Sequence, residues 1–410
     1  MSQSNLRIIV IGGGLGGLCL AQGLSKAGVT VDVYERDASL SIRTQGHRIH
    51  VDSRGEQALR ECLPSNLYEL YLATRGQPSK GMTTYKMVSG QIKDESTEFF
   101  PENGKDEFLK VGSAVDRLTL RQVLLAGLDN IVHFDKAFAR YEKENEQIRV
   151  YFTDGTSTLG DILVAADGVG SRVRQQYLPQ AEVADTGIRW LGGKTLLTDE
   201  IVSLLPQQMS ETFGTFVGPH QLNVMLGCVW FSTPPIKAAA QFWPSLNFKH
   251  TQNFLMWGLL GNQGQFPIPD EALKVMESPD LLRAASEITQ GWHPTLSTFI
   301  DQADPHDCFY LTMRQALPVN HWQTSNITLL GDAIHVKPAN GSGANSALRD
   351  ASQLARYLIA AANQEMPLHQ ALHDYEVDML DFSAKTAQAA MQRLSGKRLG
   401  ILPTPKHTES

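Results

Sequence analysis

The sequence has few of the features that mark metalloproteins and disulfide-stabilised proteins. Only four of its 410 residues are cysteines, at positions 19, 62, 228 and 308, and no two of them form a C-x-x-C pair. We therefore expect neither a redox dithiol nor a cysteine-based zinc site, but reduced, packed cysteines. No H-E-x-x-H motif occurs either, and we predict no metal site.

The chain also lacks long apolar runs and an excess of positive charge. Lys and Arg number 36 against 43 Asp and Glu, the net charge is -7, and the basic residues are dispersed. This balance argues against a nucleic-acid partner, and the apolar runs are too short to span a bilayer. The first strand begins after about five mostly polar residues, so we expect no signal peptide. We expect a cytoplasmic protein, either a monomer or a homodimer.

The most specific motif lies near the N-terminus. An apolar strand over residues 7–11 is followed at once by a G-x-G-x-x-G motif. Its glycines, Gly12, Gly14 and Gly17, allow a tight turn, the close approach of a pyrophosphate and close helix–strand packing. A helical segment and a second strand follow, and Glu35 at the end of that strand is placed to accept hydrogen bonds from a ribose. The combination predicts dinucleotide binding.

Two further strand–turn–helix segments lie far along the chain. In the segment 161–174, DILVAADGVGSRVR, Asp167 and the glycine after it end an apolar strand. In the segment 329–351, LLGDAIHVKPANGSGANSALRDA, Asp332 precedes a glycine-containing loop and a helix that opens near Ala344. The start of a helix leaves backbone N–H groups unpaired, and these can bind an anion or a polar ring. The second segment is therefore a candidate for holding a large polar ligand, whereas the first, taken alone, fits a purely structural turn equally well.

These motifs flank a middle part of different character. With 42% hydrophobic and 19% charged residues, the chain is long enough for two domains. Apolar and polar residues alternate over 183–300 as they do in β-strands, so we predict a β-rich domain inserted into the nucleotide-binding domain. The expected helices span 15–27, 115–128, 346–362 and 367–394, and a strand followed by a helix is expected within 46–62. The expected strands span 7–11, 29–34, 83–88, 91–92, 108–111, 161–166, 222–230 and 254–260, with a hairpin over 134–154.

With three motifs in this order, the chain resembles the single-component FAD-dependent aromatic hydroxylases, the flavoprotein monooxygenases of group A typified by para-hydroxybenzoate hydroxylase. An R-x-x-L helix start at Arg117 is a further match, and the resemblance covers nearly the whole chain. It implies an α/β fold in which a Rossmann-like FAD-binding domain is interleaved with a β-sheet substrate domain and followed by C-terminal helices. The implied FAD-binding domain comprises 1–75, 111–182 and 305–395, the substrate domain 76–110 and 183–304, and a tail 396–410.

The resemblance also implies the cofactors and the reaction. FAD is tightly bound, and NADPH or NADH binds transiently on the FAD-binding domain, because there is no second G-x-G-x-x-G motif. The reduced flavin reacts with O2 to give a flavin hydroperoxide, which hydroxylates an aromatic or polyketide-like small molecule. The residues implied to bind FAD are Gly12, Gly14, Leu15, Gly16, Glu35, Arg36, Arg117, Asp167, Asp332, Gly343, Ala344 and Asn345.

Candidate residues for the substrate side are less specific. Arg48 and His50 lie in a strand that passes beside the flavin in the family, so either one is a candidate catalytic residue that touches flavin or substrate. A solvated edge strand is the alternative. A phenolic substrate needs a base or a positioned donor, for which His220 and Tyr85 are candidates, although both are also ordinary polar residues. Aromatic and sulfur-containing strand residues predict either an apolar pocket or plain sheet core; they are Met225, Met256 and Trp257.

The chain departs from the family pattern between His335 and Asn345, where the segment is one residue shorter and keeps only one proline, Pro338. Other functions also remain open. A Baeyer–Villiger-type oxygenase or an oxidase can use the same scaffold, and a non-catalytic FAD-binding protein is a further alternative. A flavin halogenase is disfavoured because its W-x-W-x-I-P segment is absent.

Overall fold

The fold is described from a computed structural model of the chain. The structure describes residues 6–40, 47–88, 90–99, 112–248, 252–337 and 343–396, and the side chains of these residues except at 88 and beyond 386. The strand expected over 108–111 and the loop around Pro338 lie outside the described residues. No helix in the described ranges is long and apolar enough to cross a membrane.

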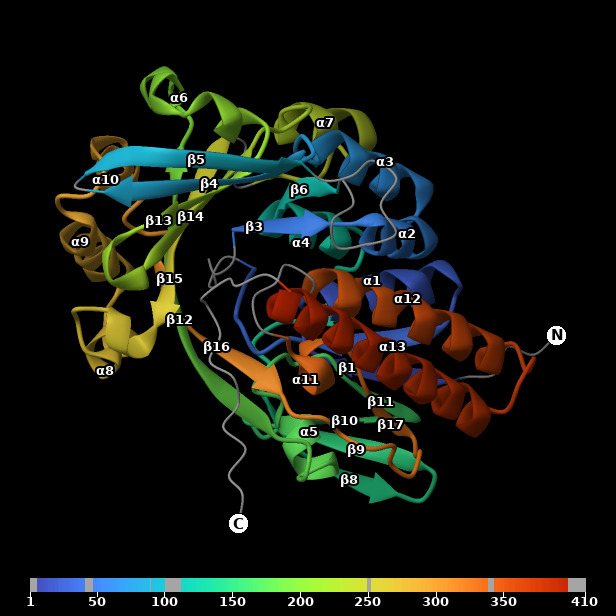
Figure 1. Cartoon of the computed structure of the whole chain (residues 1–410). Coiled ribbons are helices and arrows are strands. Elements are labelled where there is room, and N and C mark those ends of the chain that lie inside the picture. Colours follow the sequence, from blue (N-terminus) through green and yellow to red (C-terminus); the bar gives the residue numbers. More distant parts are fainter. Residues whose placement is uncertain are drawn as a thin grey trace, which may run out of the picture.

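A five-stranded parallel sheet organises the motif-bearing part of the molecule (Figure 1). Its order is β17-β11-β1-β2-β7, and Ile9 at its centre pairs with Leu163 on one side and Asp32 on the other. The central strands are apolar and buried, as expected for a parallel sheet that is covered on both faces. The strands are β1 (Arg7–Ile11), β2 (Thr30–Tyr34), β7 (Val132–His133), β11 (Ile162–Ala165) and β17 (Ile327–Leu329).

Helices and a small sheet surround these strands. Helix α1 packs against α12 and α2, and α12 packs against the long C-terminal helix α13, as Figure 1 shows. The helices are α1 (Leu15–Lys26), α2 (Ser53–Cys62), α3 (Ser65–Thr74), α4 (Arg117–Leu125), α5 (Arg172–Tyr177), α11 (Asp332–His335), α12 (Gly343–Ala362) and α13 (Leu368–Gly396). The antiparallel small sheet consists of β8 (Phe138–Glu144), β9 (Gln147–Phe152) and β10 (Ser157–Gly160).

The glycine motif holds β1, α1 and β11 close together. Gly12 has φ +111°, and a Cβ there would lie 2.3 Å from the carbonyl oxygen of Ala166. A Cβ on Gly17 would lie 2.0 Å from the carbonyl oxygen of Gly12. The motif is therefore a packing requirement of the fold in addition to any role in ligand binding.

A second, seven-stranded sheet has the order β16-β12-β15-β14-β13-β4-β5. All neighbours are antiparallel except β13 and β4. A short antiparallel pair of strands, β3 (Arg48–Val51) and β6 (Ser113–Asp116), lies beside it. The seven strands are β4 (Gly81–Val88), β5 (Gln91–Phe99), β12 (Val183–Leu196), β13 (Phe213–Val217), β14 (Asn223–Val229), β15 (Phe254–Asn262) and β16 (Phe309–Ala316).

The segment 183–300, which was expected to be β-rich, also contains helices, so that expectation was incomplete. Because one face of the sheet carries large apolar residues such as Leu255 and Trp257, that face needs a cover. Residues Leu281 and Ala285 of α9 join the same buried cluster and supply part of it. The helices of this segment are α6 (Asp199–Leu204), α7 (Pro235–Phe242), α8 (Asp270–Val275), α9 (Ser278–Thr289) and α10 (Pro294–Asp301).

The expected element bounds shift at α4. The expected helix over 115–128 begins only at Arg117, because Val115 and Asp116 belong to β6. The Asp116 carboxylate accepts a hydrogen bond from the Thr119 backbone N–H and caps the helix.

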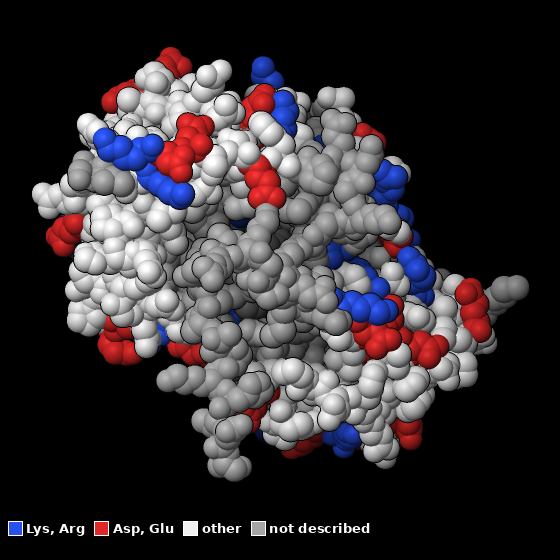
Figure 2. Space-filling view, viewed as in Figure 1, with Lys and Arg blue, Asp and Glu red and all other residues white. Residues whose placement is uncertain are grey.

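On the molecular surface, acidic and basic residues are interspersed over the face in Figure 2, in keeping with the dispersed basic residues of the sequence.

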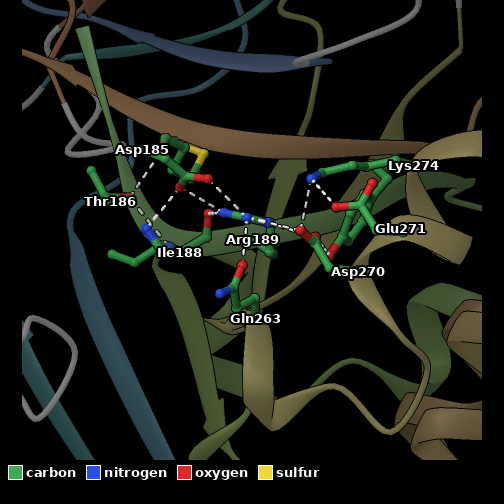
Figure 3. A network of polar contacts seen from close by, with 11 residues as sticks. Asp185, Thr186, Ile188, Arg189, Gln263, Asp270, Glu271 and Lys274 are labelled. Carbon is green, nitrogen blue, oxygen red and sulfur yellow. Dashed lines mark hydrogen bonds and ion pairs between the residues drawn. The ribbon is translucent and has the colours of Figure 1, made fainter.

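A buried ion network fixes the two long strands where the sheet is irregular (Figure 3). Between Asp185 and Arg189, β12 slips its register with β16. Arg189, 1% exposed, donates to Asp185 and to both carboxylate oxygens of Asp270 at the start of α8. Tyr310 of β16 also donates to Asp270. The network therefore connects β12, β16 and α8 across the bulge.

We predict that Gly17→Ala destabilises the protein. Glycine-to-alanine changes in helices usually stabilise by about 0.5–1 kcal/mol, but here the new methyl group collides with the Gly12 carbonyl oxygen. The free energy of unfolding should fall by about 1–3 kcal/mol in urea denaturation. Gly264→Ala is the control, because no atom lies within 4 Å of the position of its Cβ. Equal stability of the two variants would contradict the packing role.

Asp270→Asn should lower the free energy of unfolding at pH 7 by about 1.5–3 kcal/mol, because it weakens charge-assisted hydrogen bonds to Arg189. The Arg189 guanidinium holds the pKa of the Asp270 carboxyl below its ordinary value. Stability from this carboxylate is therefore present above the ordinary aspartate pKa and is lost as the pH falls. The difference between wild type and variant should shrink as the pH falls from about 5 toward 2 in denaturation curves.

The control for this variant is Glu271→Gln. The Glu271 side chain is 85% exposed and pairs only with Lys274 among the described residues. A change within about 0.5 kcal/mol is expected for an exposed pair. If the difference in the free energy of unfolding between wild type and Asp270→Asn stayed constant with pH, the Asp270 carboxylate could not be the source of that difference.

Candidate cofactor site

The sequence motifs meet at one edge of the parallel sheet. Gly12 follows β1, Glu35 follows β2, Asp167 lies two residues beyond the end of β11, and Asp332 follows β17 by three residues. These four strands are neighbours in the order β17-β11-β1-β2, and all run in the same direction. Their carboxyl ends therefore lie at the same edge, where open α/β sheets bind their ligands.

Glu35 is a buried carboxylate held by three donors. Its Oε2 accepts from the Gly13 N–H at 2.8 Å and from the Arg121 guanidinium at 3.2 Å, and its Oε1 accepts from the Asp37 N–H at 3.0 Å. Arg121 also donates to the Gly13 carbonyl at 2.8 Å. Sequence reasoning missed Arg121, although its position four residues after Arg117 on an amphipathic helix was the available signal.

The other residues of the N-terminal motif differ in how closely neighbouring residues pack against them. Gly14 caps α1 at its N-terminus, and apart from its chain neighbours no described residue places an atom within 4 Å of its Cβ position. A Cβ on Gly16 would lie 2.7 Å from a methyl carbon of Leu330, so this glycine packs the helix onto the end of β17. Leu15 is buried, and Arg36 is exposed on the surface beside Glu35.

Asp167 has one oxygen in use and one unused. Its Oδ2 accepts from the backbone N–H of Arg172 at 2.9 Å, at the start of α5. Its Oδ1 is buried and has no hydrogen-bond partner among the described residues. Burial raises the pKa of the carboxyl. Arg174 is buried in the next turn and donates to the Ala333 carbonyl at 2.8 Å, which ties the second motif to the third.

Asp332 begins α11 behind Gly331, which adopts φ +58°. Burial raises the pKa of the Asp332 carboxyl, while the charges of His335, Lys337 and Arg117 oppose that shift. The structure therefore brings Arg117 of α4 and Asp332 of α11 into one electrostatic environment.

An Asp–His pair lies beneath this turn, and the motif search did not single it out. Asp350 of α12 is fully buried. Its Oδ2 accepts from the Gly331 backbone N–H at 3.0 Å and contacts His335 Nε2 at 2.5 Å. The pair therefore anchors the turn that presents Asp332.

The start of α12 is the third part of the expected site. Gly343 and Ala344 are half-buried in the first turn, where backbone N–H groups lack partners within the helix. Asn345 is 1% exposed, and its amide is used by the protein itself. Its nitrogen donates to the His50 carbonyl at 2.8 Å, and its oxygen accepts from the Asp52 N–H at 3.0 Å. The Asn345 side chain thus fastens β3 to α12.

The two candidate catalytic residues lie on β3, opposite β6. Arg48 pairs in register with Asp116, next to Arg117, and His50 pairs with Ala114. The Arg48 side chain extends to the seven-stranded sheet, where Nε donates to the Cys228 carbonyl at 3.3 Å. Both residues are half-buried. β3 therefore connects the motif-bearing part of the molecule with the second sheet.

The other substrate-side candidates separate in the structure. His220 is exposed in a turn with φ 54°. Tyr85 is 0% exposed and stacks on Phe216 within the helix-covered core, which raises the pKa of its phenol to about 12. Trp257 belongs to that core as well, whereas Met256 belongs to a small cluster on the opposite face. The pocket interpretation is therefore wrong for Trp257, which is ordinary core.

The residues at the sheet edge fit a dinucleotide cofactor. The open space at Gly14 admits the close approach of a ligand to backbone N–H groups, and the unpartnered Asp167 Oδ1 is an acceptor that a ligand hydroxyl can satisfy. Among the residues that the structure describes, none beyond the chain neighbours lies within 4 Å of the Cβ positions of Gly168 and Gly170.

Comparison with known families agrees with this geometry. Residues 131–390 match the FAD binding domain family, and residues 10–60 match the NAD(P)-binding Rossmann-like domain family. A solved structure of a putative FAD containing monooxygenase from Photorhabdus luminescens superposes with a TM-score of 0.77 at 29% identity, covering 95% of this chain and 97% of that one.

Named relatives are similar at comparable identity. The dual O-methyltransferase/FAD-dependent monooxygenase CTB3 of Cercospora beticola is 29% identical over 397 residues, which are 92% of this chain but 44% of that protein. This chain thus spans less than half the length of the first curated relatives it matches. The FAD-dependent urate hydroxylase of Klebsiella pneumoniae is 28% identical over 92% of this chain and 86% of its own length.

The resemblance and the α/β fold predicted from the motifs are both confirmed by these matches and by the parallel sheet. The family match extends over more than half of the chain and includes two of the three motifs, Asp167 and Asp332. The third, the glycine motif, lies in the Rossmann-like match. The chain belongs to the FAD binding domain family of single-component FAD-dependent monooxygenases.

Proposed function

We propose that this chain is an FAD-dependent monooxygenase that uses NADPH or NADH and O2 to hydroxylate an aromatic or polyketide-like small molecule. The proposal rests on one arrangement: Glu35, Asp167 and Asp332 lie at the same edge of the parallel sheet. Strand β3 joins this edge to an apolar face of the second sheet. FAD bound at that edge supplies the electron transfer and oxygen activation that side chains cannot provide.

The residues at the sheet edge bind and orient the cofactor in this proposal. Backbone N–H groups at the start of α1, near Gly14, bind the pyrophosphate, as helix N-termini bind anions in general. Glu35 accepts from the adenosine ribose, and Asp332 accepts from the hydroxyls of the ribityl chain. Arg117, whose charge acts on Asp332, lies next to the same chain or a phosphate.

The start of α12 and strand β3 frame the reacting end. Gly343 and Ala344 present backbone N–H groups toward the isoalloxazine, and Asn345 holds β3 in place by its two backbone contacts. The apolar face of the second sheet then excludes water from the ring. The name of the urate hydroxylase relative supports a ring-containing substrate. In this proposal the nicotinamide cofactor binds transiently near Asp167.

Asp332→Ala should lower FAD affinity by about 1.5–3 kcal/mol, roughly 10- to 150-fold, because it removes a charged acceptor from a buried sugar contact. The measurement is a fluorescence titration of apoprotein with FAD. Asp129→Ala, at an exposed position between α4 and β7, is the control and should bind like wild type. Unchanged affinity in the Asp332 variant would remove this residue from the FAD site.

The reaction itself is tested by anaerobic stopped-flow mixing of the FAD-loaded protein with NADPH or NADH. Flavin absorbance near 450 nm should bleach with one of the two, and an aromatic ligand should accelerate the bleaching at least about tenfold if it positions the flavin for hydride transfer. Reoxidation under 18O2 should then place one labelled atom in the product. Reduction without label in any product would favour an oxidase, and no reduction with any ligand would reject the proposal.

A further inference from the structure

The two faces of the seven-stranded sheet differ in what covers them. Alternation along β14 and β15 puts Leu226, Leu255 and Trp257 into the core that α9 and α10 cover. Val229 and Met256 point to the opposite face and belong to a separate cluster there. The remaining members of that cluster are Phe254, Trp190, Phe213 and Phe231. Figure 1 shows α8, α9 and α10 on one side of the sheet and β3 and β6 on the other.

We call this second face the aromatic wall, defined by the six residues just named. Glycines in the strands that carry the wall leave space for large neighbouring side chains. A Cβ on Gly258 would lie 2.1 Å from the indole nitrogen of Trp190, and this nitrogen is buried without a hydrogen-bond acceptor among the described residues. The wall therefore carries at least one polar donor with no acceptor from the described part of the chain.

Arg48 is the cation that reaches the aromatic wall from β3. A Cβ on Gly227 would lie 2.9 Å from Arg48 Cδ and 2.8 Å from the Phe213 ring, so the strand has no side chain where the guanidinium passes. The guanidinium carbon lies 5.3 Å from the centre of the Phe213 ring, in cation–π geometry. Its Nε donates to the Cys228 carbonyl at 3.3 Å.

The charge of Arg48 is not balanced by a carboxylate of the described residues. No described Asp or Glu forms an ion pair with it. Burial lowers the pKa of its guanidinium to about 10, so it stays charged at neutral pH. A guanidinium has five N–H donors, and a half-buried guanidinium without a carboxylate partner has lost part of its hydration. An anionic ligand would remove that cost.

We propose that Arg48 binds an anionic oxygen group, a carboxylate or an ionised phenol or enol, on an aromatic substrate whose ring packs on the aromatic wall. Arg48 is then the residue that sets specificity for charged over neutral ligands. This inference rests on the proposed function, because it places the substrate in the site that FAD serves.

Ligand discrimination tests the inference in the FAD-loaded protein at pH 8. Calorimetric titrations compare 4-methoxybenzoate with 4-methoxybenzamide, and 4-nitrophenol, ionised at this pH, with 4-nitroanisole. The first pair probes a carboxylate and the second an ionised phenol. Wild type should bind at least one anion about tenfold or more tightly than its neutral partner, as expected for a charge-assisted hydrogen bond.

Three variants assign the preference to a residue. Arg48→Met should abolish it with little effect on the neutral ligands, and Arg48→Lys should keep part of it because the charge remains. Arg314→Met removes the same charge from an exposed position on β16 and should behave like wild type. Unfolding curves and FAD content of each variant separate a loss of fold from a loss of recognition.

The outcomes that overturn the inference are distinct from failure of the proposed function. Equal binding of anionic and neutral ligands by wild type, no binding of either pair, or a preference that survives in Arg48→Met would each reject it. A shifted flavin spectrum or potential in ligand-free Arg48→Met, with ligand preference intact, would assign Arg48 to the flavin instead. Protein that does not take up FAD at all would count against the proposed function.

Discussion

The parallel pairing of β1 with both of its neighbours is the constraint on which the candidate site depends. Glu35, Asp167 and Asp332 are far apart in sequence and meet only because β2, β11 and β17 run in the direction of β1. A slip of one residue would move a motif by about 3.3 Å and turn its strand's side chains to the other face. Burial of both faces of β1 opposes any such slip.

The same constraint explains why local motifs predicted so much of the site. Gly12, Gly17 and Glu35 serve a βαβ unit whose parts are adjacent in sequence, so their spacing alone specifies a conformation. In the structure Gly12 and Gly17 pack against backbone atoms, and Glu35 accepts from the Gly13 N–H. The elements β1, α1, β2 and α13 accordingly agree with the expected ranges within a few residues.

Partners that come from other elements were not predictable in this way. Arg121 reaches Glu35 from a helix 86 positions away, and the Asp350 carboxylate reaches the Gly331 N–H from the following helix. Alternation in β15 separates Met256 from Trp257 but does not tell which face the helices cover. The helices α6 to α10 were missed because short apolar segments between turns fit strands and helices equally well.

The ribbon of β12 and β16 has a mechanical consequence. Hydrogen bonds join these two long strands from Val183–Ala316, near the FAD-type motifs, to Gly192–Phe309 within the second sheet. Any motion between the two parts of the molecule must therefore bend these two strands, because at this place the parts are joined by paired strands and not by a flexible linker. The register shift beside Gly187, with φ +76°, interrupts the pairing of the ribbon, and the hydrogen bond from Arg189 to Asp270 cross-links β12 to α8 next to it.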